Sequence, residues 1–298
     1  MSQKRKGIIL AGGTGSRLYP ITKAISKQLV PVYNKPMIYY PLTTLMQANI
    51  REFLIIVNPF DLDNFKNLLG DGSDFGISIE YASQSSPDGI AQAFLIGESF
   101  LKGAPSALIL GDNLFHGNNF SAQLENASKF EKGATLFACK VSDPSRYGVV
   151  KFNNKNEVLE IAEKPENPLS DYAITGIYFY DQSVVDKAKK ITPSPRGELE
   201  ITDVNNLYIS EKNMKVEFMT SGLAWFDTGN SDSLHEASSY IRSLESRQGL
   251  MIGSPEEVSW RKGWINNNQL DKLAAKVKKT NYGKYLYGIL ERSLRSTK

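Results

Sequence analysis

The sequence contains almost no cysteine and very little histidine. Its 298 residues include one cysteine, Cys139, and two histidines, His116 and His235. A single cysteine excludes a framework of intramolecular disulfides, and these three residues do not complete a zinc site of the usual cysteine and histidine type. Because Cys139 lies within the apolar run of residues 134–141, we expect its thiol to be buried and inert.

The chain also lacks a strong excess of charge and a long apolar run. Lys+Arg 35 against Asp+Glu 32 gives a formal net charge of +3, which is too small for general binding to nucleic acid or to a membrane surface. The first apolar run stops at Gly12, far short of the roughly 20 residues that span a membrane. We therefore expect a soluble, cytoplasmic protein in which any phosphate site depends on locally placed charge.

The first half of the sequence alternates short apolar strands with helical stretches. Strands are predicted at residues 7–11, 53–57, 77–82 and 106–110, and helices at residues 36–49, 62–69 and 90–101. Near-continuous apolar strands separated by helices predict a largely parallel sheet with helices on both faces and right-handed crossovers.

The pattern changes after about residue 130. Four strands are predicted in quick succession at residues 134–141, 148–152, 158–162 and 173–180, with turns between them. From Ser231 onward the sequence is mostly helical. We predict an α/β protein with a core of residues 1–230, which includes a small β element on the substrate side, and a helical segment of residues 231–298 packed on that core.

A glycine-rich turn, residues 10–18 (LAGGTGSRL), directly follows the first strand. Glycines let the backbone approach a ligand closely, and the N–H groups of such a turn can hold phosphate oxygens. A P-loop needs a Gly-Lys pair that this turn lacks. A dinucleotide fingerprint needs a small residue where Leu18 stands and an acid after the second strand, where Asn58 stands. These residues exclude both types of loop. Without a dinucleotide fingerprint, an NAD-dependent oxidoreductase is excluded as well.

Two cations remain close to this turn. Arg17 lies near its end, and Lys27 follows ten residues later. Two positive charges beside an anion-binding turn suit a polyphosphate, whereas solvated surface charges are the alternative, and these residues alone leave both open.

Ordered motifs along nearly the whole chain resemble those of a known enzyme family. The glycine turn together with Lys27 and Pro31 resembles the signature of the sugar nucleotidylyltransferases. Further motifs narrow the resemblance to the glucose-1-phosphate thymidylyltransferases: YYPL at 39–42, LGDG at 69–72, QSSPDG at 84–89, LGDN at 110–113, RYGVV at 146–150, EKP at 163–165, RGELEITD at 196–203 and WFDTG at 225–229. The resemblance implies a Rossmann-like nucleotidyltransferase fold with a mixed, mainly parallel sheet.

The reaction implied by the resemblance joins two polyanions. A phosphate oxygen of glucose 1-phosphate attacks the α-phosphorus of dTTP, giving dTDP-glucose and pyrophosphate, the first step of dTDP-rhamnose or other deoxysugar synthesis. Coulomb repulsion is the main obstacle, and no strong general base is needed because a phosphomonoester is already mostly a dianion near neutral pH. Positioning and charge stabilisation should therefore supply the catalysis.

The resemblance also implies roles for the charged residues. Asp112 and Asp227 would coordinate Mg²⁺, which prefers oxygen ligands, and both follow apolar strands, where turn hydrogen bonding or helix capping is the alternative role. The catalytic cations would be Arg17 and Lys27 on the triphosphate and Lys164 and Arg196 on the phosphate of the sugar.

The remaining substrate contacts follow from the same resemblance. Gln84 offers an amide that can donate to and accept from a pyrimidine edge, and a carboxylate such as Glu163 suits sugar hydroxyls. The nucleotide contacts are expected to be Leu10, Gly12, Gly13, Thr14, Gly15, Ser16, Gln28, Gln84, Pro87 and Gly89. The contacts to the hexose phosphate are expected to be Asn113, Tyr147, Gly148, Glu163, Lys164, Ile174, Thr175, Arg196 and Trp225, with an ordinary core position as the alternative for Trp225.

Members of this family are commonly homotetramers with a second nucleotide site through which a dTDP-sugar inhibits. The matching segment, residues 254–261, makes Glu257 and Arg261 candidate regulatory ligands, although a salt bridge on a helix surface explains them equally well. Two departures from the family pattern are His116-Gly117-Asn118, where aromatic-Gly-His is frequent, and Phe226, which replaces a common leucine.

Two alternative functions stay open on the sequence. A related uridylyl- or cytidylyltransferase is one, and because thymine and uracil differ by a methyl group that gives only roughly 10–200-fold discrimination, we expect appreciable use of UTP. A catalytically silent regulatory subunit is the other. It should have lost its cationic or metal-binding residues, yet these are all present.

Overall fold

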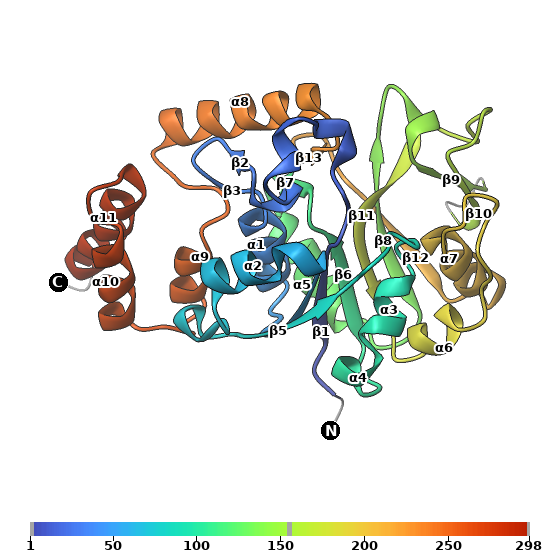
Figure 1. Cartoon of the computed structure of the whole chain (residues 1–298), viewed down its shortest axis with the longest axis horizontal. Helices are drawn as coiled ribbons and strands as arrows, with labels where there is room; N and C mark the ends of the chain where they lie inside the picture. Colours follow the sequence, from blue (N-terminus) through green and yellow to red (C-terminus); the bar gives the residue numbers. More distant parts are fainter. Residues whose placement is uncertain (1–2, 154–156, 297–298) are drawn as a thin grey trace.

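The computed structural model describes residues 3–153 and 157–296, and a mixed β-sheet forms its centre (Figure 1). The strands of this sheet are β1 (Lys6–Ala11), β4 (Glu52–Val57), β5 (Ser78–Ser83), β6 (Ser106–Leu110), β8 (Ala134–Lys140), β9 (Gly148–Phe152), β10 (Val158–Glu163), β11 (Tyr172–Tyr180) and β12 (Met214–Phe218). Within the described residues their order is β10-β9-β11-β6-β1-β4-β5, and β8 pairs with both β11 and β12.

The first half of the chain forms the parallel part of the sheet. β1 pairs in parallel with β4 and β6, and β4 pairs in parallel with β5. The second half enters through β11, which runs antiparallel to β6, β8 and β9. The α/β fold with a mixed sheet is therefore confirmed, and the four strands predicted in quick succession are all present.

Helices cover both faces of the sheet. They are α1 (Tyr39–Gln47), α2 (Leu62–Leu69), α3 (Gln92–Ile96), α4 (Glu98–Leu101), α5 (Phe120–Lys129), α6 (Val184–Ala188) and α7 (Ile201–Ser210). Ile9 packs in one core cluster, with residues of α1 and α5, while its neighbour Ile8 packs in another, with residues of α3 and α6. Successive residues of a strand point to opposite faces, so two separate cores enclose the sheet.

Two helix predictions need correction, one at its start and one in its middle. The helix predicted at residues 36–49 begins only at Tyr39, because β3 (Lys35–Pro36) pairs with β2 (Pro31–Val32). The helix predicted at residues 90–101 is two short helices that meet at Gly97. A Cβ on Gly97 would lie 3.1 Å from Cδ1 of Ile8, so this glycine allows a close approach of helix and sheet.

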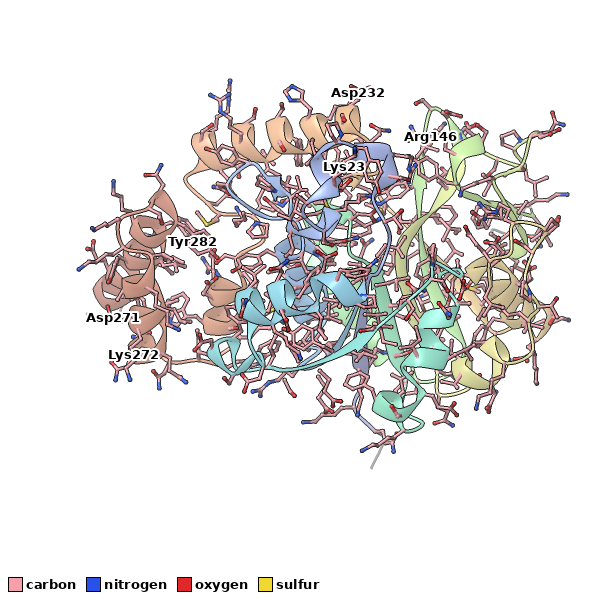
Figure 2. All side chains as sticks on the ribbon, in the orientation of Figure 1. Lys23, Arg146, Asp232, Asp271, Lys272 and Tyr282 are labelled. Carbon is pink, nitrogen blue, oxygen red and sulfur yellow. The ribbon has the colours of Figure 1, made fainter. Side chains whose placement is uncertain are left out.

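Four helices follow the sheet: α8 (Ser231–Gln248), α9 (Pro255–Arg261), α10 (Asn267–Lys276) and α11 (Asn281–Ser296). α10 and α11 pack on each other at one end of the molecule (Figure 1) around a small core of their own. Exposed Asp271 and Lys272 of α10 lie at this end, far from Arg146 in the upper right half of the view (Figure 2). The division into a core and a helical segment near residue 230 stays a prediction.

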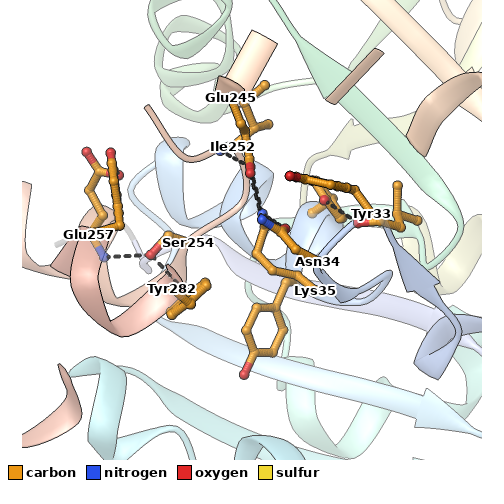
Figure 3. Close-up of polar contacts among 12 residues, drawn as sticks. Tyr33, Asn34, Lys35, Glu245, Ile252, Ser254, Glu257 and Tyr282 are labelled. Carbon is orange, nitrogen blue, oxygen red and sulfur yellow. Dashed lines mark hydrogen bonds and ion pairs between the residues drawn. The ribbon is translucent and has the colours of Figure 1, made fainter. Parts of the chain in front are cut away.

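A buried ion pair joins α8 to the β2–β3 hairpin (Figure 3). Nζ of Lys35 lies 2.7 Å from Oε1 of Glu245, and the two side chains are only 1% and 6% exposed. The backbone N–H of Ile252 and the amide of Asn34 also donate to this carboxylate, at 2.9 and 2.8 Å. The hairpin that follows Lys27 is thereby fixed to the C-terminal helices.

The thiol of Cys139 is only partly buried, so the expectation of full burial was wrong. Cys139 occupies the end of β8, where the strand approaches the surface. Its partial burial still raises the pKa of the thiol, which disfavours the reactive thiolate. Among the described residues, no helix is long and apolar enough to cross a membrane.

Candidate active site

The carboxyl ends of the parallel strands bring the predicted nucleotide residues to one edge of the sheet. Gly12 follows β1, Gln84 follows β5 and Asp112 lies two residues beyond β6. This is the edge at which open α/β sheets bind ligands. A cavity of about 300 Å³ lies there, lined by Leu10, Gly13, Arg17, Gln28, Gln84, Pro87, Gly89, Ile90, Leu110, Asp112 and Glu198.

A larger depression of about 940 Å³ lies at the other end of these strands, lined among others by Arg51, Ser73 and Pro105. None of the predicted site residues contributes to its wall. The smaller cavity therefore carries the candidate chemistry, although it is not the largest hollow in the described part of the chain.

The glycine turn has the open backbone that its sequence predicts. Gly15 has a φ of 63°, in the left-handed region that favours glycine, and the hydroxyl of Thr22 donates to its carbonyl at 2.6 Å. A Cβ on Gly12 would lie 2.5 Å from Oε1 of Gln84. Only glycine at position 12 lets the turn and the Gln84 amide share this space. Gly13, Thr14 and Ser16 of the turn are exposed, and Gly13 lines the cavity described above.

Lys27 is buried beside Asp112. The side chain of Lys27 is 6% exposed, and its ammonium donates a short hydrogen bond to Oδ2 of Asp112. Burial raises the pKa of Asp112, but the attraction of Lys27 outweighs this effect, so the net pKa lies below its ordinary value. The alternative that Lys27 is a solvated surface charge is therefore wrong.

Asp227 reaches the same place from a different strand. It ends β13 (Ala224–Asp227), which pairs antiparallel with β7 (Asn113–His116), and Asp227 lies opposite Asn113. Burial and the nearby charge of Asp112 raise the pKa of Asp227, while Lys27 lowers it only in part. Asp112 and Asp227 therefore repel each other, and the neighbouring cations, Lys27 first among them, offset this repulsion only in part.

Thr228 links the two carboxylate-bearing segments, although it was not among the predicted site residues. Its N–H and its hydroxyl both donate to the carbonyl of Asp112, at 3.1 and 2.8 Å, and its side chain is fully buried. This double hydrogen bond fixes the end of β13 against the turn after β6. Neither Asp112 nor Asp227 caps a helix, since α8 is capped by Asn230.

The donor set suits a magnesium ion. Mg²⁺ prefers oxygen ligands and is usually held by one or two carboxylates together with waters and substrate phosphates. Two carboxylates at one site match this pattern, and the described residues contain no cluster of three or more acidic, histidine or cysteine ligands. Such a site would be completed by a phosphate-bearing ligand.

Arg17 lies beside Asp227 with its guanidinium in the open. A Cβ on Gly229 would lie 3.1 Å from Nη2 of Arg17 and 3.2 Å from Oδ1 of Asp227. Arg17 is exposed and forms no hydrogen bond or ion pair with any residue that the structure describes. Its charge is therefore available to an anionic ligand.

The predicted sugar-side residues begin next to Asp112. The indole N–H of Trp225 donates to Oδ1 of Asn113 at 2.6 Å, and the amide of Asn113 donates to Oδ1 of Asp112 at 2.9 Å. The ring of Tyr147 packs against that of Trp225, with 5.1 Å between centroids. Trp225 thus holds Asn113, and through it Asp112, in place, in addition to packing as an aromatic side chain.

A carboxylate continues this surface at the β9–β10 pair. Gly148 lies opposite Glu163, and the hydroxyl of Thr202, which was not among the predicted residues, donates to Glu163 at 2.8 Å. Ile174 and Thr175 are buried in β11, and the hydroxyl of Thr175 donates to a backbone carbonyl within the sheet. Any contact of these two residues with a ligand would therefore be made by their backbone, and their role in binding the sugar stays a prediction.

The two cations assigned to the sugar phosphate lie near Glu163. Nζ of Lys164 and Nη2 of Arg196 each lie 3.8 Å from Oε1 of Glu163. Arg196 also donates to both carboxylate oxygens of Glu200 at 2.9 Å. Lys164 is half exposed, with a φ of 42°, whereas the charge of Arg196 is largely compensated by its acidic neighbours.

The predicted regulatory residues line a separate cavity of about 360 Å³, together with His116, Gly117 and Tyr285 among others. Arg261 and Glu257 form an ion pair one turn apart on α9, at 2.7 Å, and Tyr285 donates to the other oxygen of Glu257 at 2.8 Å. The salt-bridge alternative is therefore present, and the side chain of Arg261 is nevertheless 62% exposed.

Comparison with known proteins agrees with this geometry. The family model described as nucleotidyl transferase matches residues 6–243. A glucose-1-phosphate thymidylyltransferase of Xanthomonas campestris pv. campestris (strain B100) is 54% identical over 97% of this chain and 98% of its own length. Those of Neisseria meningitidis and Mycobacterium tuberculosis (strain H37Rv) are 52% and 50% identical over 96% and 97% of this chain, and over the full length of each relative.

The chain belongs to the glucose-1-phosphate thymidylyltransferase family.

Solved structures agree with membership of this family. A putative glucose-1-phosphate thymidylyltransferase from Bacillus anthracis, in complex with a sucrose, is 42% identical and superposes with a TM-score of 0.74 over 80% of this chain and 95% of that one. A UDP-glucose pyrophosphorylase complexed with UDP-glucose superposes with a TM-score of 0.71 at 24% identity, over 81% of this chain and 99% of that one, and at this identity it shows the shared fold alone.

Proposed function

We propose that the chain transfers the thymidylyl group of dTTP to glucose 1-phosphate, giving dTDP-glucose and pyrophosphate. The observation that carries this proposal is the meeting of Asp112, Asp227 and buried Lys27 beside a glycine turn, at the carboxyl edge of the sheet. Family membership supports the same reaction, since its named relatives are glucose-1-phosphate thymidylyltransferases.

The chain's own residues act mainly by placing charge. Arg17 and Lys27 stand on the triphosphate side, where they offset repulsion and stabilise the pyrophosphate that leaves. Lys164 and Arg196 hold the phosphate of the sugar in line with the α-phosphorus. In a partly dehydrated site these fixed charges are worth far more than in water, and no proton has to be removed from the attacking oxygen.

Asp112 and Asp227 would hold a magnesium ion. When bound, this ion supplies positive charge to the phosphate oxygens. The hydrogen bonds from Asn113 and Thr228 hold the two acidic segments in fixed positions, so the ion's ligands need little reorganisation.

Base and sugar recognition come from the neighbouring surfaces. Gln84 faces the pyrimidine, with Pro87 and Gly89 forming the wall of its pocket. Glu163 accepts from the hydroxyls of the hexose, and Tyr147 packs beside the ring. The backbone of the glycine turn and Gln28 contact the nucleoside and phosphates.

The proposal extends to assembly and control. We propose a homotetramer whose separate cavity, lined by Glu257 and Arg261, takes an inhibitory dTDP-sugar, because an exposed guanidinium there offers a partner for a diphosphate. We also propose that the enzyme is cytoplasmic and that its product is used in rhamnose or other deoxysugar synthesis.

The test is pyrophosphate release with glucose 1-phosphate, Mg²⁺ and each of dTTP, UTP, CTP, ATP and GTP in turn. We expect the highest kcat/KM with dTTP, appreciable use of UTP, and little release with the purine nucleotides. Folded protein that releases no pyrophosphate with dTTP would overturn the proposal and favour a regulatory subunit that only binds.

A further inference from the structure

A chain of side-chain hydrogen bonds runs behind the pyrimidine pocket. Nε2 of Gln84 donates to Oε1 of Gln92 at 2.5 Å, and Nε2 of Gln92 donates to Oδ2 of Asp88 at 2.8 Å. The hydroxyl of Ser86 donates to the same Asp88 oxygen at 2.5 Å. Gln92 lies on α3 and was not among the residues predicted from the sequence.

The carboxylate at the far end gives this chain a direction. An ionised carboxylate only accepts hydrogen bonds, so the NH₂ group of Gln92 must face Asp88. The carbonyl oxygen of Gln92 then faces Gln84, and it can be satisfied only by the NH₂ group of Gln84. The carbonyl of Gly89, 3.5 Å from the same nitrogen, favours the same orientation.

The orientation leaves one group of Gln84 for a ligand. Oε1 of Gln84 lies beside the glycine turn, where a Cβ on Gly12 would come within 2.5 Å of it. It accepts no hydrogen bond from any residue in the described ranges, although the side chain as a whole is only 4% exposed. The pocket is therefore offered a fixed hydrogen-bond acceptor.

The backbone holds the Asp88 end of the chain in place. The N–H of Leu199 donates to the carbonyl of Asp88 at 2.7 Å, and the N–H of Ala91 donates to the carbonyl of Leu199 at 3.1 Å. The loop before α3 is thereby clamped to the segment before α7, which limits movement of the carboxylate.

A fixed acceptor separates pyrimidines by their N3 position. Thymine and uracil carry an N3–H donor beside an O4 acceptor, whereas cytosine has an unprotonated N3 beside an N4 amino donor. An acceptor aimed at N3 forms a hydrogen bond with the first pair and faces a lone pair in the second. A freely rotating glutamine amide would serve both classes equally well.

We propose that Gln92 and Asp88 are positioning residues that fix the Gln84 amide and so select thymine and uracil nucleotides against cytosine nucleotides. The inference rests on the proposed function for the location of the base, and it adds the reason for the discrimination. Gln84 contacts the base, while the other two residues act through it.

The experiment compares dUTP with dCTP, because these nucleotides share the sugar and phosphates and differ only at the pyrimidine edge. For each variant, kcat/KM is measured with glucose 1-phosphate and Mg²⁺, and the dissociation constants of both nucleotides are measured by calorimetry without glucose 1-phosphate. The variants are Asp88→Asn, which lets the amide at position 92 turn over, and Gln92→Leu, which removes it. Melting curves of all variants check that they are folded.

The matched control exchanges the carboxylate and the amide between positions 88 and 92, which restores the direction of the hydrogen bonds. In the double variant Asp88→Asn/Gln92→Glu, the amide at position 88 donates to the carboxylate at position 92, which again accepts from Nε2 of Gln84. Each single variant should lower the ratio of kcat/KM for dUTP to kcat/KM for dCTP by about tenfold or more. In the variants the Gln84 amide can rotate to pair with cytosine, so dCTP no longer leaves a buried polar group unpaired. The double variant should recover most of the ratio.

The outcomes separate this inference from the proposed function. If the single variants lower activity and affinity for both nucleotides equally, so that the ratio of kcat/KM for dUTP to that for dCTP is unchanged, the chain of hydrogen bonds is only structural and the inference is wrong. If the wild-type protein releases no pyrophosphate yet binds dUTP more tightly than dCTP, and the variants lose that preference, the inference stands while the proposed reaction fails. Absence of binding to either nucleotide overturns both.

Discussion

The buried ion pair between Lys35 and Glu245 should be a major determinant of stability. The perturbation is Lys35→Met, which keeps most of the apolar stem and removes the charge. At the 2.7 Å separation of Nζ and Oε1, the Coulomb attraction is about 6 kcal/mol for an effective dielectric constant of about 20. Much of this attraction is offset by the cost of taking both charges out of water.

The variant leaves Glu245 buried without its counter-charge. Its carboxylate would retain only the hydrogen bonds from Ile252 and Asn34. Breaking a buried pair by removing one partner typically costs about 3–5 kcal/mol, because the remaining charge is uncompensated. We therefore expect Lys35→Met to lower the free energy of unfolding by that amount.

Urea unfolding measured by circular dichroism is the assay, with the slope m compared between variants. Lys276→Met is the matched control, because its ion pair with Asp74 has the same 2.7 Å separation but side chains that are 61% and 59% exposed, and such a pair contributes at most about 1 kcal/mol. The double variant Lys35→Met/Glu245→Leu should regain most of the loss, since an apolar pair of similar volume can replace a buried ion pair. Equal losses for the two single lysine variants, or a double variant no more stable than Lys35→Met, would refute this reasoning.

Three further outcomes follow from the site and its surroundings. Asp227→Asn should weaken Mn²⁺ binding at least about tenfold, measured as free Mn²⁺ by electron paramagnetic resonance, and unchanged binding would exclude Asp227 as a ligand. Burial raises the pKa of Glu256 above its ordinary value of 4.5. At a pH between the ordinary and the raised pKa, the folded chain holds a proton that the unfolded chain has lost. The stability of the fold therefore decreases as the pH rises from the ordinary pKa through the raised one. Glu256→Gln should accordingly stabilise the protein more at pH 8 than at pH 4 in thermal melts, and a uniform effect would contradict this assignment. Gly12→Ala should raise the KM for dTTP while leaving that for glucose 1-phosphate unchanged, because its Cβ would displace Oε1 of Gln84; equal changes in both would argue against a nucleotide-specific role.

Local patterns in the sequence were sufficient for the elements that depend on neighbouring residues. The helix at Leu62–Leu69 has the predicted bounds, and β6 ends at Leu110 as expected, which placed Asp112 at the carboxyl edge of the sheet. The helix ends near residues 36 and 97 were missed, because a two-residue strand pairing and a close helix–sheet contact decide them.

The residues that orient the site could not be predicted from the sequence for a different reason. Gln92 contacts Gln84 through a side-chain hydrogen bond that no local sequence pattern predicts. Thr228 contacts Asp112, which lies 116 positions away in the sequence. The hydrogen bond between Trp225 and Asn113 spans 112 positions. Only the folded chain reveals that these residues orient the ones that the motifs had already indicated.

The most direct measurement of the central claim uses glucose 1-phosphate labelled with oxygen-18 in the three non-bridging phosphate oxygens, together with dTTP and Mg²⁺. Attack of the sugar phosphate on the α-phosphorus predicts that mass spectrometry finds all of the label in dTDP-glucose and none in pyrophosphate, with the two products formed in equal amounts. Formation of dTMP without the sugar, or appearance of the label in pyrophosphate, would contradict the account.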